Sequence, residues 1–111
     1  MNTPNNPNES SQIGTGTIIK GKIITKEDIR VDGQVDGTLE TNGRLIVGNK
    51  GNVTGVLKTK ETIVSGKLDV GQLETDKITF KSTSHFKGEI HYKQMTVEPG
   101  AVIEGSLNTR K

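Results

Sequence analysis

Two histidines are the residues of this chain best suited to bind a metal ion or to transfer a proton. His85 and His91 are six residues apart, and the 111-residue sequence contains no cysteine. A metal site would need carboxylate ligands to converge on both histidines, and two histidines are too few for a three-histidine zinc site. We therefore expect exposed histidines in a loop or strand, with no catalytic residue, no metal site and no bound cofactor.

The other motifs with chemical potential also favour structural roles. Gly48 and Gly51 in "GNKGN" lack the strand-to-helix setting of a phosphate-binding loop, so we interpret them as turn glycines. Lysines such as Lys58 and Lys60 alternate along the chain with acidic residues, which is typical of a solvated surface of mixed charge. Tyr92 is the only aromatic residue suited to stacking on a base, so nucleic acid is not an expected partner.

Composition indicates a single domain with a thin aliphatic core. Only 29% of the residues are hydrophobic, the formal charge is +2, and the aromatic residues are one Tyr and two Phe. The absence of Cys excludes disulfides and fits a reducing compartment, so we expect a cytoplasmic protein. No apolar run approaches the ~20 residues of a membrane-spanning helix, and the N-terminus lacks the apolar stretch of a signal peptide.

A short unit, apolar-x-Gly-x-apolar, recurs along the chain. Its glycines are Gly21, Gly37, Gly55, Gly71, Gly88 and Gly105. The successive spacings are 16, 18, 16, 17 and 17 residues, with an irregular copy around Leu68–Leu73. Each unit is preceded by a second pair of alternating residues, as in Leu45-x-Val47. A period of this length predicts a solenoid.

The solenoid is expected to be all-β. Apolar residues at i and i+2, with a glycine in every unit, contradict the 3.6-residue period of a helix. About 17 residues per turn and three short apolar segments predict a triangular coil, and parallel pairing between successive coils gives a parallel β-helix of about six coils. The repeated glycines share the parity of their apolar neighbours, so we expect them at crowded corners with their missing side chains directed inward. Gly33 in "VDGQV" is expected in a tight turn.

The boundaries follow from composition. Residues 1–12 are polar and rich in Asn and Pro, so we expect a disordered tail. Residues 13–107 form the predicted β-helix, and 108–111 a short C-terminal tail. Neither end of the β-helix shows a capping segment, and uncovered ends favour stacking of copies into an open filament. The expected polymerisation interface comprises Ile18, Ile19 and Ile23 at one end and Met95, Val97, Ile103 and Leu107 at the other.

The stretches "IRVDGQVDG", "LIVGNKGNVTG" and "PGAVIEG" make the chain resemble the bactofilins, bacterial cytoskeletal proteins that form polymers. The resemblance extends from about Ile18 to Leu107. It implies a right-handed parallel β-helix, nucleotide-independent assembly into non-polar filaments in which like ends meet, and a role in organising cell-wall enzymes, envelope proteins or other cell-shape machinery. Some members bind membrane through an apolar N-terminal segment. Residues 1–12 contain none, so we expect membrane contact through partners rather than directly.

Other interpretations remain open from the sequence. The chain could be a discrete β-helical module that binds a ligand on one face, or a fragment of a hexapeptide-repeat acyltransferase, although consecutive six-residue units are absent. It could also be a monomer with frayed ends. An ice-binding face is not favoured, because Thr15-x-Thr17 is the sole Thr-x-Thr motif. A filament and a discrete small oligomer are distinguished by size-exclusion chromatography.

Overall fold

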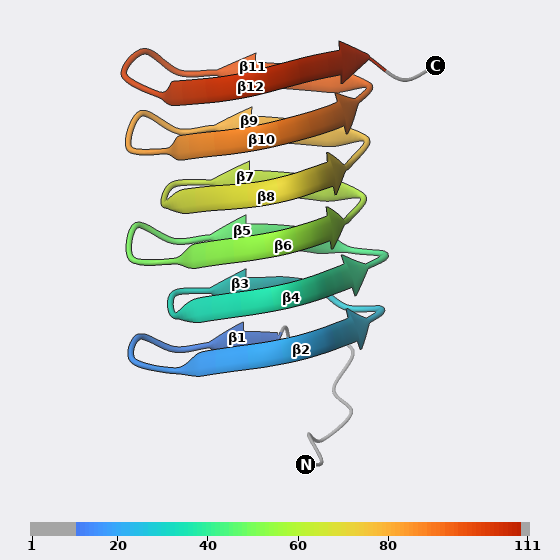
Figure 1. Ribbon diagram of the computed structural model, residues 1–111, viewed down its shortest axis with the longest axis vertical. Helices are drawn as coiled ribbons and strands as arrows, with labels where there is room; N and C mark the ends of the chain where they lie inside the picture. The colour runs from blue at the N-terminus through green and yellow to red at the C-terminus, as the bar shows by residue number, and fades with distance from the viewer. Residues whose placement is uncertain (1–10, 110–111) are drawn as a thin grey trace.

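The computed structural model describes residues 11–109, in which every regular element is a β-strand (Figure 1). Six short strands are β1 (Ser11–Ile13), β3 (Ile29–Val31), β5 (Arg44–Val47), β7 (Glu61–Val64), β9 (Lys77–Phe80) and β11 (Gln94–Val97). Six longer strands are β2 (Ile18–Thr25), β4 (Gln34–Thr41), β6 (Asn52–Lys58), β8 (Lys67–Glu74), β10 (His85–Tyr92) and β12 (Val102–Thr109). Within these residues there is no helix long and apolar enough to cross a membrane.

Short and long strands alternate along the chain and form two separate parallel sheets. The short strands pair in the order β1-β3-β5-β7-β9-β11, and the long strands in the order β12-β10-β8-β6-β4-β2. In Figure 1 the chain follows each long strand across the front, returns behind it along a short strand, and rises by one level, which is a right-handed path. The predicted all-β, right-handed parallel β-helix of about six coils is therefore confirmed.

Each coil contains two strands rather than the three short segments expected from the sequence. The second and third predicted segments belong to one long strand, because parallel pairing continues through the glycine between them. In β4, for example, Val35 and Leu39 lie on either side of Gly37 and all three residues have partners in β6. The glycine therefore modifies the course of a strand without ending it.

The core is a set of interior columns that run along the rod. One column joins Val31, Val47, Val64 and Phe80, all fully buried, because successive coils place these residues in register. Seventeen hydrophobic residues are buried among the described residues: Ile13, Ile29, Val31, Val35, Leu39, Leu45, Val47, Val53, Leu57, Val64, Leu68, Val70, Leu73, Ile78, Phe80, Phe86 and Ile90. Phe80 and Phe86 meet edge to face, with ring centroids 5.6 Å apart. The thin aliphatic core is completed by this aromatic pair.

A ladder of glycines runs along the long strands. Gly37 pairs with Gly21 on one side and Gly55 on the other, and Gly37 has φ +141°. A Cβ atom on Gly37 would collide with the carbonyl oxygen of Gly21. The vacant side-chain position therefore faces the backbone of the preceding coil, and not the interior as the parity of the sequence predicted. Gly88 and Gly105 repeat the arrangement in the last two coils.

The fourth coil departs from this ladder, and Gly71 is not its corner residue as we predicted. Val70 takes the place opposite Gly55 and Gly88, and the register of β8 shifts at this point. Gly71 is the extra residue of a bulge, without the positive φ of the ladder glycines. The bulge is what allows Val70, which is 1% exposed, to enter the ladder without a positive φ.

The turns between short and long strands contain the remaining predicted turn glycines. Gly51 donates its N–H to the carbonyl of Gly48 at 2.8 Å, which closes a turn between β5 and β6. Gly33 lies in the two-residue link between β3 and β4 and donates its N–H to the carbonyl of Ile13 in the preceding coil at 3.1 Å. The short link is thus held against the turn of the coil beneath it.

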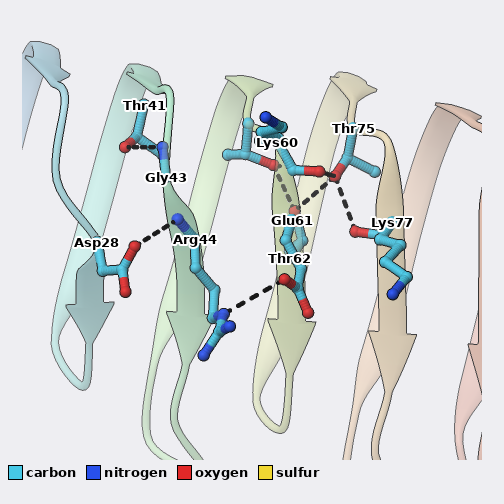
Figure 2. A network of polar contacts seen from close by, with 10 residues as sticks. Asp28, Thr41, Gly43, Arg44, Lys60, Glu61, Thr62, Thr75 and Lys77 are labelled. Carbon is cyan, nitrogen blue, oxygen red and sulfur yellow. Dashed lines mark hydrogen bonds and ion pairs between the residues drawn. The ribbon is translucent and has the colours of Figure 1, made fainter.

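Threonine hydroxyls fill the interior at the opposite side of the rod, where long strands lead into short ones. Thr59, Thr62 and Thr75 are buried, and their hydroxyl groups hydrogen-bond to one another. Thr75 Oγ1 also donates to a backbone carbonyl, either that of Lys77 at 2.9 Å or that of Lys60 at 3.3 Å (Figure 2). This buried hydroxyl cluster explains why Thr62 occupies a column whose neighbours are Leu45 and Ile78.

Polar contacts on the outside connect successive coils. Asp28 accepts a hydrogen bond from the backbone N–H of Arg44 at 2.9 Å, and the Arg44 side chain lies 3.4 Å from Glu61 in the next coil (Figure 2). Pairs of this kind on an exposed surface stabilise a fold by about 0–1 kcal/mol each. They are compatible with the register that the interior columns set, and those columns supply most of the stability.

The rod extends slightly beyond the predicted limits of 13 and 107. Ser11 pairs with Ile29 at the N-terminal end, and Thr109 pairs with Tyr92 at the C-terminal end. Backbone pairing needs no apolar side chain, so the polar residues that the hydrophobic pattern assigned to the tails still take part in strands. The predicted disordered tail falls mainly on residues 1–10, which lie outside the described residues, as do 110–111.

Candidate self-assembly interfaces at the two ends

The C-terminal end of the rod exposes a section through the core. Leu107 lies in register with Ile90 of the preceding coil, yet Leu107 is 45% exposed whereas Ile90 is fully buried. Val97 lies in register with Phe80 and is 47% exposed, again beside a fully buried neighbour. Met95 and Ile103 also lie in interior columns and are only partly buried. These side chains point into the solenoid, and within residues 11–109 no further strand covers the sixth coil.

The N-terminal end has the same character with less apolar surface. Ile19 and Ile23 of β2 are in register with the fully interior Val35 and Leu39, and both isoleucines are only partly buried. Ile13 of β1 is buried at 6% exposure. Two isoleucines thus form the exposed apolar section of this end.

Both ends also carry unpaired strand edges. β1 and β2 are the outermost strands at one end, and β11 and β12 at the other, so each has a pairing partner on one side only. Edge strands present free N–H and C=O groups that favour pairing with another chain. No segment among residues 11–109 covers either edge. Each end of the rod therefore presents both exposed apolar side chains of the interior columns and unpaired backbone N–H and C=O groups.

Ile18 belongs to a different surface from the other predicted interface residues. It is in register with Gln34, on the outward side of the long strands, and is 61% exposed. Ile24 lies on the same outward side and is 65% exposed. In β2 the outward and inward positions are both isoleucine, so hydrophobicity could not separate them. Counting the alternation of inward and outward positions from Gly21 could have separated the outward isoleucines from the inward ones.

The residues considered for metal chemistry are not gathered into a site. His85 is exposed, and His91 lies 3.0 Å from Glu89 on the same strand. Among residues 11–109 no group of three or more His, Cys, Asp or Glu side chains is arranged to hold a metal ion. The pKa of Arg30 is raised, because its guanidinium donates a hydrogen bond to Asp32 and lies beside that negative charge. This is a surface ion pair.

The described residues define a class: a parallel β-solenoid whose core, between residues 11 and 109, is exposed at both ends. The family model described as "Bactofilin: Polymer-forming cytoskeletal" matches residues 11–108. The chain belongs to the bactofilin family, and the resemblance noted in the sequence is thereby confirmed.

Relatives and solved structures agree with this assignment. Bactofilin BacO of Myxococcus xanthus is 25% identical over 96 residues, covering 86% of this chain and 76% of the relative. Bactofilin BacP of the same organism is 28% identical over 101 residues, covering 90% of this chain but only 42% of the relative. The cryo-EM reconstruction of Thermus thermophilus bactofilin double helical filaments has TM-score 0.85 and 27% identity, covering 90% and 99% of the two chains. A mutant crystal structure of the Thermus protein has TM-score 0.77 and 25% identity, covering 81% and 100%.

Proposed function

We propose that this chain assembles end to end, without nucleotide, into non-polar filaments that serve as a cytoskeletal scaffold. The observation that carries the proposal is the exposure of interior columns at both ends, seen most clearly in Leu107 and Val97. A chain with two such surfaces keeps one free after each contact, so growth is open-ended. Membership of a polymer-forming family and the filament formed by the Thermus relative support the proposal of end-to-end assembly.

The contact between copies involves apolar packing and backbone pairing together. Covering Val97, Leu107 and their neighbours removes apolar surface from water, and a second edge strand satisfies the free backbone groups of β12. The same two terms hold successive coils together within one molecule. The glycines of "GNKGN" close a turn, so this proposal gives them no role in binding a nucleotide.

The scaffold's cellular role is the organisation of other proteins. We infer that the filament recruits cell-wall enzymes or envelope proteins along its outward faces, in the cytoplasm and at the inner side of the membrane through those partners. The chain itself acts as a structural protein and not as an enzyme in this proposal. A filament repeats each outward face at regular intervals, and such repetition strengthens weak binding of a clustered partner.

Imaging of the purified chain tests this function. Negative-stain electron microscopy, with and without added ATP or GTP, should show filaments of the same abundance in all samples. A single small species by size-exclusion chromatography at high protein concentration would contradict the proposal and favour the discrete ligand-binding module.

A further inference from the structure

The charges of the chain are distributed unevenly between the ends and the middle of the rod. Residues 11–26 contain three lysines and no acidic residue, and residues 94–109 contain two glutamates and no lysine or arginine. Residues 27–93 contain ten acidic and ten basic residues, so they have no formal net charge. The excess charge of the described rod therefore lies entirely in its first and last coils, positive at the N-terminal end and negative at the C-terminal end.

The lysines of the first coil are less well compensated than the charges of the last coil. Lys20 and Lys22 are exposed on the outward side of β2, and Lys26 is exposed just after it. Within residues 11–109 none of these three forms an ion pair. Lys20 is in register with Asp36 of the second coil, whereas Lys22 is in register with Thr38 and has no carboxylate at the corresponding position.

The glutamates of the last coil are better compensated. Glu98 lies 3.4 Å from Lys81 and accepts a hydrogen bond from the backbone N–H of Ser82 at 3.1 Å, both in the preceding coil. Glu104 is in register with Lys87. Each glutamate thus has a lysine of the fifth coil beside it, whereas of the two lysines in β2 only Lys20, beside Asp36, has an opposite charge at the corresponding position.

We propose that the two end contacts differ in strength and in salt dependence: the C-terminal ends of two copies join first and tightly, and the N-terminal contact is weaker and strengthens when salt screens its lysines. The proposal rests on the proposed function, in which like ends meet. Two N-terminal ends bring six lysines within a few strand spacings of about 4.8 Å, which is inside the screening length of about 10 Å at 0.1 M salt. The assembly unit is then a C-terminal dimer.

Apolar surface favours the same order. The C-terminal end exposes parts of four interior side chains, those of Met95, Val97, Ile103 and Leu107, whereas the N-terminal end offers Ile19 and Ile23. Apolar burial is the non-directional attraction available to both contacts, and it is roughly proportional to area. The contact with more apolar surface is therefore also the one with less uncompensated charge.

Two variants isolate the two contacts. Ile23→Lys blocks the N-terminal end and leaves C-terminal dimers, whereas Val97→Lys blocks the C-terminal end and leaves N-terminal dimers. Ile19→Lys and Ile103→Lys provide a second pair of variants for the same two ends. Circular dichroism establishes which of the four variants are folded. Sedimentation velocity at about 50 and 500 mM NaCl gives both dissociation constants. We expect the C-terminal dimer to be tighter and to change less than about threefold, and the N-terminal dimer to tighten about tenfold at high salt.

A charge variant separates screening from other effects of salt. In the Val97→Lys background, Lys22→Gln should strengthen the N-terminal dimer at low salt and reduce its salt response. Lys67→Gln is the matched control, because Lys67 is an exposed outward lysine of the middle coil β8. Lys67→Gln should leave the dissociation constant of the N-terminal dimer at low salt and its change with salt unaltered.

Two results would overturn the proposal. One is an N-terminal dimer as tight as the C-terminal dimer at low salt. The other is a mixed dimer on combining the two blocked variants, because such a species can form only when an N-terminal end meets a C-terminal end. Wild-type filaments observed alongside either result would leave end-to-end assembly intact: the first result contradicts only the order of the contacts, and the second also contradicts the meeting of like ends.

Discussion

Leu107 and Ile90 occupy the same interior column one coil apart, yet 45% of Leu107 is exposed to solvent and none of Ile90 is. The difference comes from position alone, since both are aliphatic residues with the same orientation in parallel strands. A solenoid that repeats its core to the last coil has an unfinished interior surface. Self-assembly completes that surface with the same side-chain packing and strand pairing that join its own coils.

The glycine ladder should be intolerant of a methyl group. Gly37→Ala is expected to lower the free energy of unfolding by about 2–4 kcal/mol, because its Cβ meets the carbonyl of Gly21 and its φ is +141°. Chemical denaturation in a non-polymerising Val97→Lys background measures the change without contributions from the filament.

Gly71→Ala is the matched control for that substitution. The space beside Gly71 is open, because the nearest atom to an added Cβ would be the carbonyl oxygen of Gly55 at 3.9 Å, and the φ of Gly71 is not positive. We expect a change within about 0.5 kcal/mol. Equal losses for Gly37→Ala and Gly71→Ala would show that the ladder does not depend on the close approach of successive glycines.

The buried hydroxyl cluster gives a second stability prediction. Thr62→Val keeps the shape of the side chain but removes the hydroxyl that Thr59 and Thr75 contact, so we expect a loss of about 1–2 kcal/mol. Thr79→Val, on the outward side of β9, should change stability by less than about 0.5 kcal/mol. If Thr62→Val were instead stabilising, the apolar character of the column, set by Leu45 and Ile78, would outweigh the hydrogen bonds.

The side chains of β2 that point inward lie at the proposed interface, and those that point outward lie on the outer surface of the rod. Ile23→Gln places an amide in an interior column at the N-terminal end and should reduce filament length severalfold at a given protein concentration. Ile18→Gln should leave filaments unchanged, because Ile18 points outward and its neighbour in the next coil is already Gln34. Electron microscopy of both variants provides the comparison. Loss of filaments in Ile18→Gln alone would place the contact on the outer face.

The sequence predicted the coil number, the parallel pairing and most of the glycine ladder, because a period near 17 residues imposes one register on every coil. It identified the copy around Leu68–Leu73 as irregular but assigned the ladder position there to Gly71, whereas Val70 occupies it. Leu68 and Leu73 are five residues apart, whereas Val53 and Leu57 are four apart, and that difference marks the extra residue.

Two further features depend on contacts between coils, which a linear pattern does not contain. The Thr59–Thr62–Thr75 cluster joins residues from separate links and strands, so nothing near Thr62 in the sequence indicates its partners. The outward position of Ile18 follows from its pairing with Gln34, since both faces of β2 carry isoleucine. The sequence showed no capping segment at either end, but hydrophobicity did not assign each terminal side chain to a face.

The central claim is that the uncovered coils bind copies of the same chain, and high-speed sedimentation of wild type beside Val97→Lys and Ile103→Lys tests it most directly. Wild type should pellet as filaments that are visible by electron microscopy. Both variants should remain in the supernatant as folded, β-rich particles no larger than dimers, because a charge in the terminal section of the core prevents that end from being covered. Filaments that persist in both variants would contradict the account.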